Sequence, residues 1–354
     1  MNEQLVKALI APGVCGTLWT PRSMFSTLTP RVKRILLESR PQIVCLHGMP
    51  ESLDVAAETV WGELTLLAKD EGWNPPPRLW IGVACDTILE QTALKRIHPD
   101  QAAIKLCAAS RVASELNAEM VLWDAEAACK LDPIRTGIAA GLTIQMTRNL
   151  YKGLVQGHTA YAVPTYHSET DVAGNSLLHG YPWSSWCGKE GVDVAIPQVY
   201  VAPSTPETGP RPFAPPGAFR LAIQTHRHSW AQAQQHGWIR EDLPVWMYGQ
   251  LHHVPYWQTV SFASDPYLEN PYLTDPKMER SGVSPYVFCG WTIADKYCDE
   301  HGEVAMRALC ELARRGQNVA DFQRSVGFSG KAIDGYFGVM TATAMGLEVP
   351  NVPG

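Results

Sequence analysis

The stretch Val121-Leu122-Trp123-Asp124-Ala125-Glu126-Ala127 ends an apolar run with two carboxylates that stand two positions apart. Alternate side chains of a β-strand point to the same face, so we expect Asp124 and Glu126 to share a face of one strand. Similar short apolar runs recur along the chain with helical stretches between them, which is the pattern of βα units. The eight candidate strands are Val6–Ala11, Gln42–His47, Leu79–Cys85, Met120–Glu126, Ala160–Thr165, Val192–Val201, Leu243–Gln250 and Pro285–Trp291.

Eight strands are the number that closes a barrel, and continuous apolar strands are typical of parallel sheets that are covered on both faces. The predicted fold is therefore α/β, a (β/α)8 TIM barrel with a small C-terminal helical segment. We predict a barrel domain over residues 1–315 and the helical segment over residues 316–354. The expected helices are Arg31–Ser39, Ser52–Ala68, Ala102–Leu116, Asp132–Leu154, Phe219–Gln235 and Glu303–Arg314, and the expected long loops are Ala202–Pro216 and Val254–Gly282.

The composition limits the classes of function. Hydrophobic residues make up 45% of the chain and charged residues 18%, which is typical of a globular protein with a sizeable core. A net charge of −6 without a basic stripe argues against nucleic-acid binding. No apolar run approaches the ~20 residues of a membrane span. The apolar run within Met1–Leu9 is too short for a signal peptide.

The cysteines, histidines and glycines predict neither a metal nor a cofactor. The nine cysteines are scattered without a C-x-x-C pair, which indicates free buried thiols and folding in a reducing compartment. His226 with His228, or His252 with His253, are candidate zinc ligands, but neither pair has the i, i+4 spacing of a zincin. No phosphate-binding or dinucleotide-binding glycine motif is found in the sequence.

Polar and aromatic residues stand at the ends of most candidate strands, where the catalytic face of a barrel is built. Two carboxyls as close as those of Asp124 and Glu126 repel when both are ionised, so the pKa of one should rise. A protonated carboxyl beside an ionised one is what glycosidic cleavage requires. Two alternatives stay open: the acids pair with a Lys or Arg near the strand end, and Tyr200 and Gln198 only pack and cap the sixth strand. The other residues at strand ends are Asp86, Tyr166, His167, Tyr248, Gln250 and Trp291.

The D-x-E pattern of Asp124 and Glu126 resembles the catalytic motif of the barrel lysozymes in family 25 of the glycoside hydrolases, which cut between N-acetylmuramic acid and N-acetylglucosamine. The resemblance implies that Glu126 is the proton donor and that Asp124 stabilises the transition state. Those lysozymes also carry an acid at the end of the first strand, whereas Ala11-Pro12-Gly13-Val14 offers none. The segment is also similar to the end of the strand-four motif of family 18 chitinases, which implies that Tyr200 orients an N-acetyl group. Met120-Val121-Leu122 replaces the longer acidic run of the chitinases.

A C-terminal stretch of about thirty residues resembles a peptidoglycan-binding module. The family pattern is a helix that ends in F-Q, a turn, then D-G-x-x-G and T before a final helix. Phe322-Gln323, Asp334-Gly335-Tyr336-Phe337-Gly338 and Thr341 stand at the matching positions. The alternative is a helical cap that packs on the barrel and binds nothing.

Together these features predict a peptidoglycan hydrolase of the muramidase or endolysin type, made in the cytoplasm without a signal peptide and delivered to the cell wall by release or by a phage-type particle. Its partner is expected to be peptidoglycan or a related N-acetylated glycan, without membrane insertion. The alternatives are an N-acetylglucosaminidase or chitinase-like hydrolase, and a catalytically inactive glycan-binding barrel. The expected catalytic residues are Glu126, Asp124 and Tyr200, the expected substrate-binding residues are Gln198, Tyr166, Asp86, Tyr248, Gln250 and Trp291, and the aromatics expected to line a glycan cleft are Trp183, Trp186, Tyr256 and Trp257.

Overall fold

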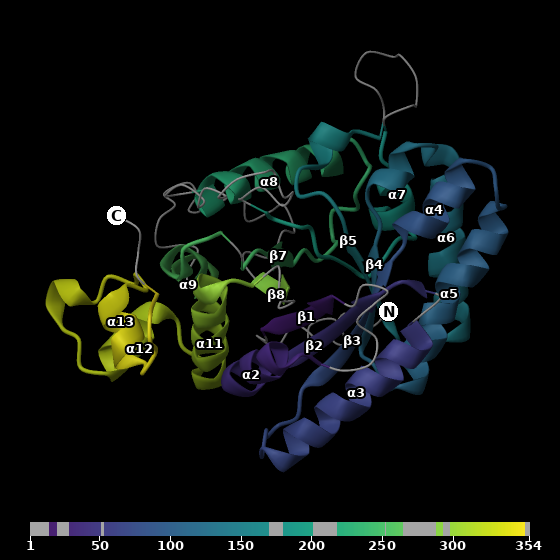
Figure 1. Cartoon of the computed structure of the whole chain (residues 1–354). Helices are drawn as coiled ribbons and strands as arrows, with labels where there is room; N and C mark the ends of the chain where they lie inside the picture. The colour runs from purple at the N-terminus through teal and green to yellow at the C-terminus, as the bar shows by residue number, and fades with distance from the viewer. Residues whose placement is uncertain are drawn as a thin grey trace, which may run out of the picture.

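Eight parallel strands form the centre of the molecule (Figure 1). The computed structural model describes residues 14–19, 28–50, 53–169, 180–200, 218–251, 253–264, 288–292 and 298–350. The strands follow one another in the order β6-β5-β4-β3-β2-β1-β8-β7. They are β1 (Cys15–Trp19), β2 (Ile43–Gly48), β3 (Arg78–Ala84), β4 (Met120–Asp124), β5 (Val155–Thr159), β6 (Val194–Ala195), β7 (Met247–Gly249) and β8 (Phe288–Thr292).

The two outermost strands of this order, β6 and β7, also meet. Isolated parallel bridges join Ala195 to Val245 and Gln198 to Tyr248. The Trp246 N–H donates to the Ala195 carbonyl at 2.8 Å. A sheet whose two edges pair with each other is a closed barrel. The predicted (β/α)8 TIM-barrel fold is therefore confirmed.

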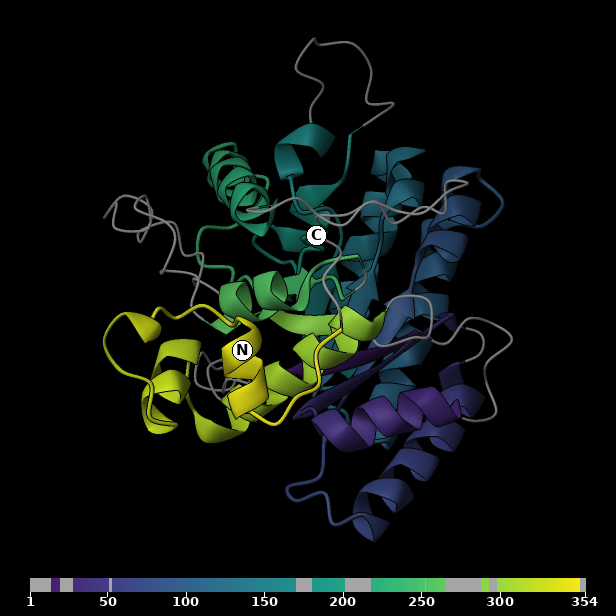
Figure 2. The same cartoon turned by 60° about the vertical axis from the view of Figure 1, so that its left-hand side comes forward.

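Helices follow the strands along the chain and cover the outside of the barrel (Figures 1 and 2). Several begin where the sequence analysis expects them. Thr29 caps α2 and Asp132 caps α6, and each cap is followed by a proline that suits the first helical turn. The helices are α2 (Pro30–Ser39), α3 (Leu53–Asp70), α4 (Asp86–Ala93), α5 (Pro99–Glu115), α6 (Pro133–Leu150), α7 (Trp183–Cys187), α8 (Ala218–Gln235), α9 (Tyr256–Ser264) and α11 (Glu300–Arg315), with 3-10 turns η2 (Ala127–Lys130) and η3 (Pro164–His167).

The strand side chains divide between two buried layers. Outward-facing residues such as Val121 and Trp123 of β4 pack against the helices. Inward-facing residues alternate with them, so Met120 and Leu122 fill the barrel and Asp124 is the next inward position. The inward cluster consists of Cys15, Ile43, Cys45, Trp80, Met120, Leu122, Val155, Val194, Ile196, Trp246 and Tyr248.

The fifth strand differs from its prediction. The strand is Val155–Thr159, whereas the sequence predicted Ala160–Thr165. The polar residues Gln156 and His158 interrupt the apolar pattern from which strands were predicted, although both are buried and hydrogen-bonded. The Gln156 amide group accepts from Trp123 Nε1 at 3.2 Å and donates to the Ile144 carbonyl at 3.1 Å. Satisfied polar groups of this kind are tolerated in a core, and apolar-run patterns do not find them.

Other predicted elements need smaller corrections. The predicted strand Val6–Ala11 and the predicted loop Ala202–Pro216 lie outside the described residues, and the first described strand is β1. Helix α9 occupies part of the predicted loop Val254–Gly282. Within the described ranges, no helix is both long and apolar enough to cross a membrane. The eight cysteines whose side chains are described are buried and free.

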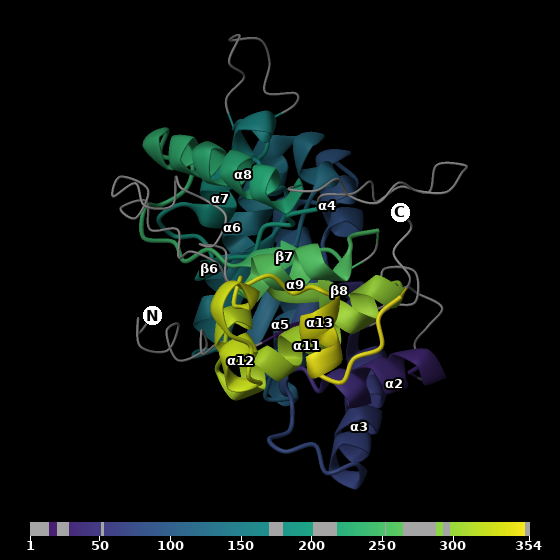
Figure 3. The same cartoon turned by 90° about the vertical axis from the view of Figure 1, so that its left-hand side faces the viewer.

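The C-terminal segment consists of α12 (Val319–Ser325), η5 (Gly330–Ala332) and α13 (Val339–Ala344), and it lies beside α9 and α11 (Figure 3). The buried Gln323 side chain holds it together. Its Nε2 donates to Asp334 Oδ1, the Tyr336 carbonyl and Thr341 Oγ1 at 2.9–3.1 Å, and its Oε1 accepts from the Gly335 N–H at 3.0 Å. These contacts give a physical reason for the F-Q, D-G and T positions of the motif.

One residue of the segment joins it to the barrel helices. The Phe337 N–H donates to Ser261 Oγ of α9 at 2.8 Å. The buried Phe337 ring meets that of Tyr256 edge to face, with centroids 6.2 Å apart. Gly316, with φ 62°, ends α11 just before the segment. The division into domains at residues 315 and 316 stays a prediction.

Candidate active site

Asp124 faces inward at the end of β4, and His47 faces it from β2. His47 Nε2 lies 3.1 Å from Asp124 Oδ2, and the two side chains are only 4% and 12% exposed. Gly82 of β3 makes room for the imidazole, because a Cβ at this position would lie 2.4 Å from His47 Cδ2. The His47 ring therefore packs directly against the backbone of β3 at Gly82.

Gln198 contacts both acids at once. It stands just past β6 and bridges to Tyr161 on one side and to Tyr248 on the other. Its side-chain Nε2 donates to Asp124 Oδ1 at 3.1 Å and to Glu126 Oε1 at 2.5 Å. One amide group therefore keeps the two carboxyls side by side.

Asp86 brings a third carboxyl to the group. It is the first residue of α4, and its Oδ1 accepts a hydrogen bond from the Glu126 N–H at 2.8 Å. Burial raises the pKa of Asp86, and the charge of Asp124 adds to this effect. Burial also raises the pKa of Glu126 to about 8, with further contributions from the charges of Asp124 and Asp86. Glu126 is thus a carboxyl that keeps its proton at neutral pH.

Glu126 also interacts electrostatically with a lysine. Lys130, the last residue of η2, places its Nζ 2.6 Å from His167 Nδ1 and 4.0 Å from the centre of the Tyr161 ring. The His167 and Tyr161 rings stack with centroids 3.8 Å apart. Burial lowers the pKa of His167 to about 4, and the charge of Lys130 adds to the shift, so His167 is neutral and accepts a hydrogen bond from the lysine. The charge of Lys130 lowers the pKa of Glu126, but only as the smallest of its causes.

The structure brings some predicted site residues together and leaves others apart. Asp86, Asp124, Glu126 and Gln198 form the acid cluster, a name used here for these four residues. The remaining predicted residues differ in setting: Tyr248 and Gln250 are buried, Tyr200 lies past the end of β6 and is 39% exposed, Tyr166 is 74% exposed on η3, and the side chain of Trp291 lies outside the described part of the chain.

The aromatic residues that were expected to line a glycan cleft are mostly core residues. Trp183, Trp186 and Tyr256 are fully buried, so they cannot contact a polymer, and Trp257 is half-buried. The prediction that these three rings line a glycan cleft is therefore wrong, and they are part of the core.

The described histidines that were weighed as zinc ligands belong to no group of metal ligands. His226 Nδ1 is hydrogen-bonded to the Ala162 carbonyl, His228 is exposed, and His252 lies outside the described residues. Across the described ranges, no group of three or more His, Cys, Asp or Glu side chains is arranged to hold a metal ion.

Three residues of this site were not predicted from the sequence, namely His47, Lys130 and Tyr161. The strand pattern contained a signal for His47, because Ile43, Cys45 and His47 alternate on one face of a predicted strand. Tyr161 was placed inside the predicted fifth strand, whereas it follows the end of β5. Lys130 follows from no pattern in the sequence.

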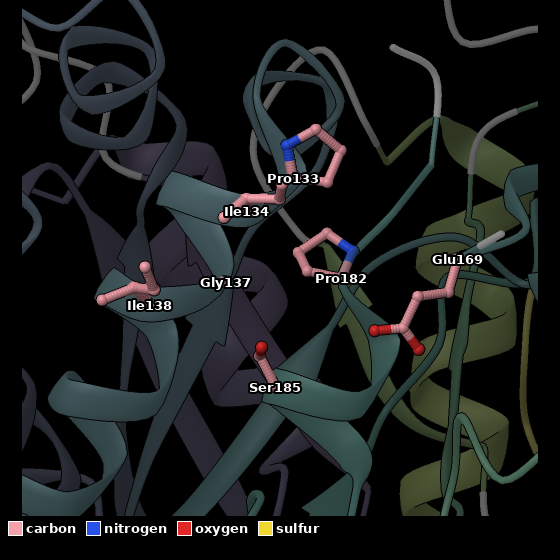
Figure 4. Close-up of a pocket in the computed structure, with 7 residues that line it drawn as sticks. All are labelled: Pro133, Ile134, Gly137, Ile138, Glu169, Pro182 and Ser185. Carbon is pink, nitrogen blue, oxygen red and sulfur yellow. The ribbon is translucent and has the colours of Figure 1, made fainter. Parts of the chain in front are cut away.

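A separate small cavity of about 240 Å³ lies between α6 and α7 (Figure 4). The Glu169 side chain points toward it, and its carboxylate accepts from the Ser184 N–H at 3.2 Å and from the Ser184 hydroxyl. None of its lining residues belongs to the acid cluster, so the cavity is distinct from the candidate active site. The lining residues are Pro133, Ile134, Gly137, Ile138, Glu169, Pro182 and Ser185.

Comparison with protein-family models and with curated protein sequences gave no match. Among solved structures, a chitinase from Rhizomucor miehei is similar with a TM-score of 0.41 and 11% identity, over 84% of this chain and 99% of that chain. A putative deoxyribose-phosphate aldolase from Toxoplasma gondii ME49 is similar with a TM-score of 0.39 and 8% identity, over 87% and 98%. The assignment of the barrel rests on its own strand order and closure.

Proposed function

We propose that this protein is a glycoside hydrolase that cleaves a glycosidic bond of peptidoglycan, with Glu126 as the proton donor. The observation that carries the proposal is the pair of carboxyls, Glu126 and Asp124, that share the Gln198 amide. Burial raises the pKa of Glu126 to about 8. A glycosidase needs one carboxyl that is still protonated at the working pH and a second that is ionised. Burial and the negative charges of its neighbours produce the first of these at Glu126.

Asp124 is proposed to stabilise the positive charge that develops at the anomeric carbon. Contacts to His47 and Gln198 fix both of its carboxylate oxygens. Two oxygens that contact one nitrogen at 2.5 and 3.1 Å lie closer together than the roughly 6.5–9.5 Å between the carboxyls of inverting glycosidases. The arrangement leaves no room for a water between the carboxyls and therefore favours retention of the anomeric configuration.

The choice of peptidoglycan as substrate is supported by the C-terminal segment. Its resemblance to a peptidoglycan-binding module gains a physical basis from Gln323, which cross-links the motif positions Asp334, Gly335 and Thr341. Tyr200 stays the proposed contact for an N-acetyl group. The enzyme is proposed to reach the wall by release from the cell or on a phage-type particle.

The test compares the full chain with Glu126→Gln and Asp124→Asn variants on purified cell walls. New reducing ends are expected from the wild type only, and mass spectrometry of the fragments identifies the sugar that carries the new end. Glu169→Gln is the matched control, because burial also raises the pKa of Glu169 but its carboxyl lies outside the acid cluster.

One observation favours a second function, a barrel that binds glycan without cutting it. Strand β1, Cys15–Trp19, contains no acid, just as the predicted first strand contains none. Wall binding by every variant with no fragments from the wild type would support this function and contradict the proposed hydrolysis.

A further inference from the structure

The peptide group between Ala125 and Glu126 is held at both of its polar atoms. The Glu126 N–H donates to Asp86 Oδ1 at 2.8 Å. The Ala125 carbonyl accepts from the Tyr181 hydroxyl at 2.6 Å. Both atoms belong to one planar unit and point in opposite directions, so a rotation of the plane breaks both bonds. Two side chains from outside β4 therefore fix the backbone from which the Glu126 side chain departs.

The Tyr181 hydroxyl has only one proton, and this fixes which atom is the donor and which the acceptor in each hydrogen bond that follows. Its hydroxyl donates that proton to the Ala125 carbonyl, so it must accept from His158 Nε2, which lies 2.8 Å away. His158 Nδ1 is then the acceptor, and Cys187 Sγ lies 3.6 Å from it. Burial lowers the pKa of His158 to about 3, so the ring is neutral, as this order of donors and acceptors requires.

Buried rings hold this chain of hydrogen bonds in place. The His158 ring stacks on Trp186 with centroids 4.8 Å apart and an interplanar angle of 16°. The Tyr181 ring packs against Trp183 at 4.5 Å. All four side chains are buried, so the hydroxyl has no access to water as an alternative partner.

We propose that Tyr181, oriented by His158, is a positioning residue for Glu126. Together with Asp86 it holds the Ala125–Glu126 peptide plane and thereby keeps the Glu126 carboxyl inside the acid cluster. The catalytic meaning of this role rests on the proposed function, whereas the restraint on the backbone does not.

The groups that face Glu126 determine how its pKa would change if the Ala125–Glu126 peptide plane were free to rotate. They are Asp124 on β4, Asp86 on α4, Lys130 on η2 and the Tyr161 ring after β5, in addition to the Gln198 amide. The Glu126 pKa is high because the carboxyl is buried beside two negative charges. A peptide plane that is free to rotate lets the carboxyl reach water, so its pKa falls toward the ordinary glutamate value.

The experiment compares Tyr181→Phe with the wild type by two NMR measurements. One is amide hydrogen exchange at Glu126, and the other is a ¹³C titration of the Glu126 carboxyl, whose signal is assigned by its absence in Glu126→Gln. Tyr256→Phe is the matched control, because Tyr256 is equally buried and its hydroxyl has no hydrogen-bond partner among the described residues.

In Tyr181→Phe we expect exchange at Glu126 to speed up at least about fivefold, the carboxyl to titrate at a lower pH, and the amide of Val44 on β2 to exchange at its wild-type rate. Tyr256→Phe should leave all three unchanged. An unchanged Glu126 amide and carboxyl, or an equal change at Val44, would overturn the proposal. Both measurements work without turnover, so absence of hydrolysis by the wild type would contradict the proposed function alone.

Discussion

The imidazole of His47 lies against Gly82 on one side and 3.1 Å from the Asp124 carboxylate on the other. The three residues belong to adjacent strands, β2, β3 and β4. The imidazole that contacts Asp124 therefore depends for its space on a residue without a side chain.

Gly82→Ala is expected to displace the His47 ring, because the new Cβ would lie 2.4 Å from its Cδ2. We expect a loss of about 1–3 kcal/mol in the free energy of unfolding from overpacking, together with a fall in hydrolysis rate. Denaturant titration and wall-digestion assays measure the two effects. Gly62→Ala in α3 is the control, since its Cβ meets nothing within 4 Å. A Gly82→Ala protein with wild-type stability and rate would contradict the role of the glycine.

The rate of hydrolysis should fall as the pH rises through about 8, the pKa of Glu126, because only the protonated carboxyl can donate to the leaving oxygen. A pH profile of kcat/KM on soluble wall fragments tests this. An upper limb near the ordinary pKa of a glutamate would show that Glu126 is not the acid.

The same carboxyl links stability to pH. Its pKa rises from 4.5 in the unfolded chain to about 8 in the folded protein, so the folded state binds more protons between these values. The free energy of unfolding therefore falls as the pH rises through this window. Glu126→Gln removes this slope and should be more stable than the wild type at pH 8.5, by on the order of 1–2 kcal/mol. Thermal unfolding at pH 5 and pH 8.5 provides the comparison, and equal pH slopes would contradict the assigned pKa.

Gln198→Leu removes the amide that both acids share. The hydrolysis rate should drop about 10–100-fold, because the carboxyls lose a donor that orients them. The hydrogen bond from Gln198 lowers the pKa of Glu126, so the upper limb of the pH profile should move to higher pH. A shift to lower pH would show that the amide does not act on Glu126 in this way.

Gln323→Ala should loosen the C-terminal segment while the barrel stays folded. The substitution leaves the Gly335 N–H without its acceptor and removes the hydrogen bond that Gln323 donates to the Thr341 hydroxyl, at a cost of about 2–3 kcal/mol. Limited proteolysis should then cut within residues 316–350, and wall binding should weaken. Gln317→Ala is the control, because the Gln317 side-chain oxygen has no hydrogen-bond partner among the described residues. Unchanged proteolysis would show that Gln323 does not hold the segment together.

The parts of the fold that the sequence predicted are those with local signals. Thr29-Pro30 and Asp132-Pro133 mark the starts of α2 and α6, and the apolar run of β4 places Asp124 inward. The fifth strand was missed because burial of His158 depends on Tyr181, which stands outside the strand.

The rest of the site depends on contacts between residues far apart in the chain. Tyr181 reaches the Ala125 carbonyl, and Asp86 reaches the Glu126 N–H, across 56 and 40 positions. In the same way, Trp80 and Trp246 stack inside the barrel with ring centroids 5.8 Å apart, although they lie far apart in the sequence. No spacing in the sequence brings such pairs together.

The packing of Phe337 against α9 affects where a wall-bound enzyme would cut its substrate. A module on a flexible linker searches a sphere around its anchor, and its effective concentration falls as the linker lengthens. Phe337 and its N–H bond to Ser261 instead give the C-terminal segment one orientation against the barrel. Under the proposed function, the bond that is cleaved would therefore lie at a fixed distance from the point where the C-terminal segment binds the glycan strand. The lengths of the released fragments would depend on that distance.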